Sequence, residues 1–338
     1  MTRRTVTAWE SGEVDSPPSD IIAKALRFPE EFFYGDDPFL VPSESVSFRA
    51  LSSMLARQVD RVLATAALAI EFSRWIDQHY TSPAVDLPDL SDSQSLEPAL
   101  AAESVRSIWG INENPVRDAL FLLEKKGIRV FSLPVSDREV DAFSFWYDRR
   151  PFILLDTGRT SERMRFDLAH ELAHLLLHRQ SQLRSRETEQ QAHDFASSFL
   201  MPADALYGQV TGQLRFDDIF KLKKHWKVSA VAMLSRLWHL RIISEWHYRT
   251  WMIELSKRGY RLSEPGGVHP ESSRLFRQLF SYARQDGWTL ARISEELRFP
   301  EGEIDGMVFG LAIASAPPGA PALGADESPE FRRLYRAK

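Results

Sequence analysis

The chain has 338 residues with a formal charge of −5, and 43% of its residues are hydrophobic. This length exceeds that of a usual single domain, so we expect two or three units with apolar cores. The chain has no cysteine, which excludes disulfides and thiolate metal sites, and its acidic balance excludes a basic field over the whole surface. We expect a cytoplasmic protein without a membrane segment, because the best apolar run, residues 62–70, is too short to span a bilayer.

Two short helices are expected at the N-terminus, in residues 3–12 and 17–26. The first contains Arg3, Arg4 and Thr5, which could touch phosphates or bases. The pair resembles the recognition helix and the following helix of Xre-type helix-turn-helix domains. Such domains normally have two more helices before this point, which hold the recognition helix in the major groove. The segment also has at least as many acidic as basic residues, so DNA binding is only weakly supported.

More helices are predicted before the middle of the chain. Apolar residues recur at helical spacing in residues 48–80 and indicate one or two amphipathic helices that pack on the core of the protein. Residues 81–98 contain three prolines and little apolar periodicity, which predicts an exposed linker. Residues 100–108 and 115–126 predict helices that lead into a sheet at Gly127.

Three segments rich in β-branched and aromatic residues follow, at residues 127–133, 140–147 and 152–156. Short polar or proline-containing stretches separate them, so they predict a small antiparallel sheet. An edge of such a sheet could bind an extended peptide by strand addition, which recognises backbone rather than sequence. A plain structural hairpin explains any one strand equally well.

The most informative motif is His-Glu-x-x-His, formed by His170, Glu171 and His174 inside an apolar helical run. Residues four apart lie on one helix face, so two imidazoles can bind one cation while Glu171 reaches a water beside it. The alternative is a buried helix whose histidines are satisfied core residues, but buried histidines need a partner and a metal is one. His178 could line the same face, although we favour a solvated or capping histidine at the helix end.

A third metal ligand is expected on the next helix, because a catalytic zinc site needs three protein ligands and one open position. Apolar residues repeat at helical spacing from residue 192 until Pro202. Glu189 and His193 are four residues apart and project together, which suits a carboxylate ligand beside a residue that hydrogen-bonds a metal-bound imidazole. Glu187 is two residues from Glu189 and cannot share that face, so Glu189 is the better candidate.

The run Arg-Phe-x-Leu-Ala-His-Glu-Leu-x-His-Leu-Leu-Leu-His, then Glu-x-x-Ala-x-x-Phe-Ala, then Leu-Met-Pro, resembles the gluzincin-like ImmA/IrrE metallopeptidase family. The resemblance implies that His170, His174 and Glu189 bind the metal. It implies Glu171 as the general base of an endopeptidase. The expected fold is α+β and mainly helical, with a small antiparallel sheet packed on the motif helix of a zincin-like core.

Two positions depart from the family pattern. Ala173 stands where the family usually has Gly, and His193 stands where it usually has Asn. His193 could support a metal-bound imidazole, be an additional ligand or indicate altered chemistry; we favour the first, because Glu189 already completes the ligand set. Zn²⁺ is the expected cofactor, but two histidines and a carboxylate could also accept Mn²⁺ or Fe²⁺.

Helices are also predicted at residues 216–226 and 229–240, the second with Ser229 as its N-cap. The residue that would stabilise the oxyanion is not identified by the sequence. Five side chains are candidates for it: His178, His225, His239, His247 and Tyr248.

Residues 272–285 and 290–297 predict a helix-turn-helix-like pair. The sequence Leu-Arg-Phe-Pro-Glu ends an amphipathic helix at residues 26–30 and again at residues 297–301. A shared way of ending a helix explains this repeat nearly as well as duplication does.

Four parts are expected along the chain. They are a partial helix-turn-helix segment at 1–35, a helical segment and linker at 36–98, a metallopeptidase domain at 99–255, and a C-terminal helical domain with a flexible tail at 256–338.

The leading hypothesis is a cytoplasmic zinc endopeptidase with a protein substrate. The family resemblance suggests that the substrate is a transcriptional repressor or similar regulatory protein in a stress, prophage or mobile-element switch. The rival hypothesis is a DNA- or protein-binding regulator or antitoxin that uses the peptidase fold, with a structural or sensory metal. Repressor cleavage separates the two, because metal occupancy with an intact partner favours binding.

Overall fold

The structure is a computed structural model that describes residues 2–14, 18–35, 39, 41, 56–90, 96–133, 141–179, 185–260 and 264–312. Its α-helices are α1 (Arg3–Glu10), α2 (Ser19–Leu26), α4 (Ala56–His79), α5 (Pro98–Ile108), α6 (Ala119–Lys125), α7 (Ser161–Leu177), α8 (Arg186–Leu200), α9 (Ala203–Gln209), α10 (Asp218–Trp226), α11 (Ala230–His239), α12 (Glu245–Lys257), α13 (Arg274–Gln285), α14 (Leu290–Leu297) and α15 (Glu301–Met307). The other elements are the 3₁₀ helix η1 (Glu30–Tyr34) and the strands β1 (Arg129–Leu133), β2 (Ala142–Tyr147) and β3 (Arg150–Asp156). Residues 313–338, which include the predicted flexible tail, and residues 48–55 of the first predicted amphipathic segment lie outside the described residues.

The prediction of a mainly helical α+β fold with a small sheet is confirmed. The prediction of an antiparallel sheet is wrong, because the sheet is mixed. Its order is β1-β3-β2, with β3 antiparallel to β2 and parallel to β1. Asp148 and Arg149 both have positive φ, which suits the tight turn of the β2–β3 hairpin. Because the chain reverses between β1 and β2 and again at this turn, β1 and β3 run in the same direction.

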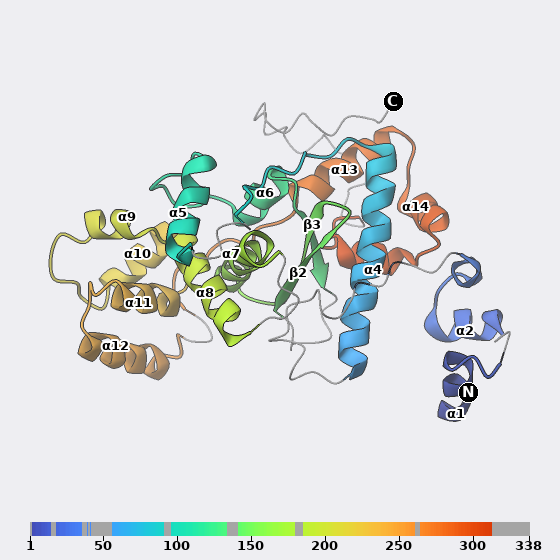
Figure 1. The fold of residues 1–338 in the computed structure, drawn as a ribbon, viewed down its shortest axis with the longest axis horizontal. Coiled ribbons are helices and arrows are strands. Elements are labelled where there is room, and N and C mark those ends of the chain that lie inside the picture. The colour runs from blue at the N-terminus through green and yellow to red at the C-terminus, as the bar shows by residue number, and fades with distance from the viewer. Residues whose placement is uncertain are drawn as a thin grey trace.

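The sheet separates two hydrophobic clusters, since alternate residues of each strand point to opposite faces. Val130 and Ile153 point to a cluster that includes buried residues of α5, α7, α8 and α11. Phe131 and Leu154 point to a cluster formed with α4 and α13–α15. Figure 1 shows α7 and α4 on opposite sides of the sheet. The C-terminal helices therefore share a core with the sheet and α4, and we retain the four-part division of the chain as a proposal.

The two Leu-Arg-Phe-Pro-Glu segments have the same conformation. Arg27 and Arg298 are both left-handed, with φ of 60° and 59°. The backbone N–H of Phe28 donates to the carbonyl of Ala23 at 3.1 Å, and that of Phe299 donates to Ser294 at 3.1 Å. This is the six-residue bond of a Schellman helix end, so the repeat corresponds to one way of ending α2 and α14.

Buried carboxylates fix the segment that leads from α12 to the C-terminal helices. Glu162 of α7 accepts a hydrogen bond from the backbone N–H of Val268 at 2.9 Å. Glu271 forms an ion pair with Arg165 of α7 and accepts from two backbone N–H groups at the start of α6. Glu124 of α6 accepts from the first backbone N–H groups of α13, at 3.0 and 3.1 Å. These contacts bind the connecting segment to α7 and α6, and they bind the start of α13 directly to α6.

We expect Glu124 to make stability depend on pH. Burial raises its pKa from the ordinary value of 4.5 to about 7, although hydrogen bonds from Ser273 and from the start of α13 act to lower it. Because the folded carboxyl binds its proton more tightly than the unfolded one, its contribution to stability is fully present below pH 4.5 and is lost as the pH rises through 7.

The test is Glu124→Gln, whose amide can accept from the same N–H groups. Between pH 5 and 8, the wild type should lose about 2.5 kcal/mol of unfolding free energy relative to this variant. Denaturant unfolding of both metal-free proteins across this range measures the difference. Parallel pH profiles would show that Glu124 does not titrate in this way.

Candidate metal centre

The motif residues lie on α7, which is buried along most of its length. The side chain of Thr160 accepts a hydrogen bond from the backbone N–H of Arg163 and begins the helix, and Leu168, Leu172 and Leu175 bury it in the core. The neighbouring helix, α8, begins with a capping box formed by Ser185 and Thr188. Glu189 lies in the first turn of α8, which packs along α7 and so brings this carboxylate to the motif.

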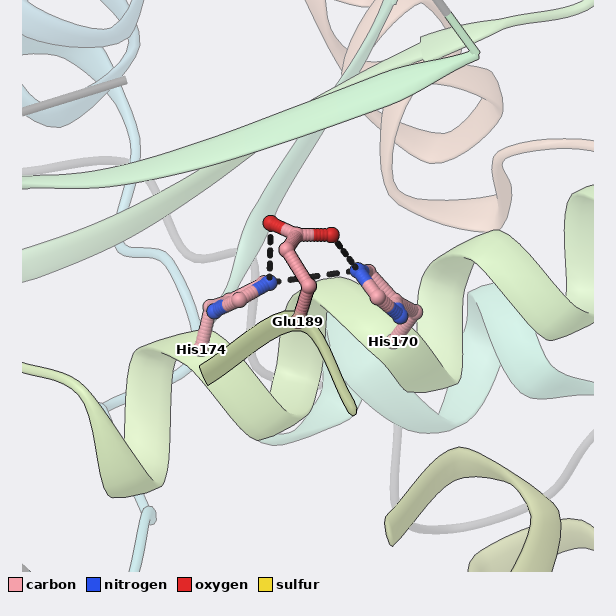
Figure 2. A group of neighbouring side chains, drawn as sticks. All are labelled: His170, His174 and Glu189. Carbon is pink, nitrogen blue, oxygen red and sulfur yellow. Dashed lines mark hydrogen bonds and ion pairs between the residues drawn. The ribbon is translucent and has the colours of Figure 1, made fainter. Parts of the chain in front are cut away.

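The side chains of His170, His174 and Glu189 converge between α7 and α8, as Figure 2 shows. The two histidine Nε2 atoms lie 3.1 Å apart. Oε2 of Glu189 lies 3.4 Å from Nε2 of His170, and Oε1 of Glu189 lies 3.5 Å from Nε2 of His174. Ligand atoms about 2.05 Å from a tetrahedral zinc ion are about 3.3 Å from one another. The two Nε2 atoms are spaced for two corners of such a tetrahedron, and one ligand atom from each of the three side chains lies within 4.8 Å of the others, so all three could contact a single cation.

The charge of Glu189 is also suited to a cation. Its burial acts to raise its pKa, but hydrogen bonds and attraction from His170 and His174 outweigh burial and hold the pKa far below its usual range. One turn before the motif, Asp167 shows the opposite balance. Burial raises its pKa to about 7 despite the Arg163 guanidinium, whose Nε lies 3.1 Å away. The Glu189 carboxylate, whose pKa is lowered, therefore faces both motif histidines.

Glu171 points toward the sheet side of α7. It is 2% exposed, and its Oε2 accepts a hydrogen bond of 2.6 Å from the Ser144 hydroxyl of β2. This contact holds one carboxylate oxygen against the sheet beside the two histidines. Glu171 is therefore held by β2 and is not one of the three residues of the cluster.

Residues 123–237 match the family model described as the IrrE N-terminal-like domain, Peptidase_M78. This part of the chain is therefore similar to the peptidase domain of the ImmA/IrrE family. The matched range begins in α6 and includes the whole sheet, α7, α8 and most of α11. No curated protein matches the chain in sequence. The match supports a metallopeptidase type of function and a protein substrate.

Within this IrrE-type domain, we expect Ser144 to orient Glu171. Replacing Ser144 with Ala removes the 2.6 Å hydrogen bond and leaves the carboxylate free to turn. Cleavage should slow about 10-fold while zinc affinity stays unchanged, because the hydroxyl of Ser144 donates to Glu171, which is not one of the three residues of the cluster. Initial rates and zinc titration of the variant check this, with Ser144→Thr, which retains a hydroxyl, as the control. A rate equal to that of the wild type would contradict the role.

His178 contacts the motif residue His174, although its place at the helix end favoured a solvated or capping histidine. It is the C-cap residue of α7, in accord with the capping interpretation, but its side chain is only 9% exposed and is not solvated. Its Nδ1 lies 2.8 Å from Nδ1 of His174, and its Nε2 lies 2.9 Å from Oε1 of Gln191 on α8. Gln191 was not identified from the sequence at all.

His193 lies next to the cluster, on the exposed side of α8. Its ring centroid is 4.7 Å from that of Phe166 and 6.2 Å from that of His170. The predicted hydrogen bond from His193 to a metal-bound imidazole stays a prediction.

The other candidates for an oxyanion donor lie on α10–α12, beside tryptophans. His225 packs against Trp226, His239 and Tyr248 pack against Trp238, and His247 packs against Trp251. None of these contacts directs a donor toward the motif.

In the described part of the chain, no helix combines the length and the apolar character needed to cross a bilayer.

Proposed function

We propose that the chain is a zinc-dependent endopeptidase of the cytoplasm that cleaves a transcriptional repressor or a similar regulatory protein in a stress, prophage or mobile-element switch. One observation is central to this proposal. The Nε2 atoms of His170 and His174 lie 3.1 Å apart, and each lies within 3.5 Å of one oxygen of the Glu189 carboxylate, so the three side chains could bind one cation. The family match at residues 123–237 supports the same chemistry.

His170, His174 and Glu189 would hold the cation, with both histidines using Nε2. When bound, it would lower the pKa of a water to ~7 and polarise the scissile carbonyl. Glu171 would accept the proton of the attacking water and later donate a proton to the leaving amine. Ser144 would hold the Glu171 carboxylate in place during both transfers, because its hydroxyl already donates to Oε2.

The substrate would bind as an extended peptide along β2. In the described ranges, β2 pairs with β3 alone and lies at the edge of the sheet order β1-β3-β2. Trp146 of this strand donates from Nε1 to the carbonyl of Leu175 on α7 at 3.2 Å, which fixes β2 beside the motif helix. A peptide added to this edge would pair through its backbone and would run next to the cluster.

The test is cleavage of cellular proteins by the zinc-loaded chain, with new N-termini identified by mass spectrometry. The control reactions use the Glu171→Gln variant and the chelated protein. A transcriptional regulator cut by the wild type alone would support the proposal. Stoichiometric zinc together with capture of an intact regulator would instead favour the rival hypothesis of a binding protein or antitoxin.

A further inference from the structure

A series of hydrogen-bonded side chains, His174, His178 and Gln191, extends from the cluster on the side away from the cation position. His174 is 2% exposed, and its Nδ1 lies 2.8 Å from Nδ1 of His178. The other ring nitrogen of His178, Nε2, lies 2.9 Å from Oε1 of Gln191. These hydrogen bonds therefore connect the last turn of α7, through its C-cap residue His178, to α8.

The positions of the protons in this series follow from the role of His174. If Nε2 of His174 binds a cation, the ring is neutral and its proton lies on Nδ1. That N–H can only donate, so Nδ1 of His178 has to accept. His178 then has its own proton on Nε2, where it donates to the Gln191 carbonyl oxygen. All three groups have complementary roles in one tautomeric arrangement.

We propose that His178 and Gln191 are positioning residues that hold His174 in the tautomer and the ring orientation that a cation requires. This inference rests on the proposed function, because it takes His174 as a metal ligand. Burial strengthens it, since an imidazole without a partner for its second nitrogen would lose a hydrogen bond in an apolar surrounding.

Helix α8 contributes to both sides of the site. Glu189 faces the Nε2 atoms of His170 and His174. Gln191, two residues later, contacts His178, which in turn contacts His174 on the side away from the cation. A displacement of α8 would thus disturb a ligand and the support of another ligand together.

The experiment compares zinc affinity, measured by competition with a chromophoric chelator, in four variants of the full chain. His178→Leu removes the acceptor, and we expect zinc affinity to fall 10- to 100-fold. His178→Asn places an amide oxygen near the former Nδ1 and should restore most of this loss. Gln191→Leu should weaken zinc about 10-fold. The matched control is Gln190→Leu, since Gln190 bonds to Asp194 on the exposed side of α8 and should leave affinity unchanged.

A second readout detects the tautomers directly. Long-range ¹H–¹⁵N spectra of the zinc-loaded wild type should show His174 protonated on Nδ1 and His178 protonated on Nε2. A purely structural role for His178 does not require this pattern. The opposite assignment for His178 would overturn the inference.

The outcomes separate this inference from the proposed function. A wild type that binds zinc with the same affinity as His178→Leu and Gln191→Leu overturns the inference and leaves the function standing. An Asn variant as weak as the Leu variant also overturns it, because the loss then reflects packing. A wild type that binds no zinc overturns both. If His178→Leu fails to show an unfolding transition, the comparison of Gln191→Leu with Gln190→Leu decides.

Discussion

Replacing Glu171 with Gln should reduce peptide cleavage about 10³-fold and leave bound zinc unchanged. The amide has almost the same size as the carboxylate, and its oxygen can still accept the hydrogen bond from Ser144. It cannot accept a proton from water at neutral pH. Because Glu171 is not one of the three residues that form the cluster, its neutralisation leaves the metal ligands in place.

Two measurements are needed on the same preparation. Initial rates on an identified protein substrate give the loss of activity, and elemental analysis gives zinc per chain. A suitable control is Glu187→Gln, the same change at an exposed carboxylate in the first turn of α8, which should alter neither quantity. Full activity in the Glu171→Gln variant would remove this residue as the general base.

Local patterns were sufficient for the elements that contain the cluster. The motif and its helical period lie within α7, and the spacing of Glu189 and the apolar residues lies within α8, so one helix at a time could be predicted. Ser229 was likewise predicted as an N-cap and accepts the backbone N–H of Ala232 at 3.1 Å. In contrast, α12 was not predicted; within it only Trp251 and Leu255 are buried, which is too few for a periodic signal.

Contacts between elements could not be predicted in the same way. The partner of β1 depends on where the β2–β3 hairpin docks, and no residue of β1 specifies that. The buried side chain of His178 contacts Gln191 on another helix, α8. Its position at the end of α7 indicates only a capping histidine. The residues around Ser144 in the sequence do not indicate that its hydroxyl contacts Glu171. The residues that support the candidate site, unlike its candidate ligands, therefore became identifiable only from the packing of α7 against α8 and β2.

Replacing Glu189 with Ala should remove most bound metal, whereas replacing His193 with Ala should leave most of it. Glu189 is the only carboxylate of the cluster, and its oxygens lie 3.4 and 3.5 Å from the two Nε2 atoms. If a zinc-binding free energy of ~10 kcal/mol is shared by three ligands, losing one costs about 3 kcal/mol, or roughly 10²-fold in affinity. The ring centroid of His193 is 6.2 Å from that of His170, so its loss should have a smaller effect.

Metal per chain in the wild type and in both variants, measured after zinc reconstitution and gel filtration, discriminates between these roles. Metal lost in Glu189→Ala and retained in His193→Ala would establish a site of two histidines and one glutamate, and the same analysis would detect Mn²⁺ or Fe²⁺ in its place. The reverse pattern would make His193 the third ligand, since it projects from α8 one turn after Glu189. A wild type without metal would favour a binding protein with a peptidase fold, because the two motif histidines and Glu189 would then be held together by their mutual hydrogen bonds and charge alone.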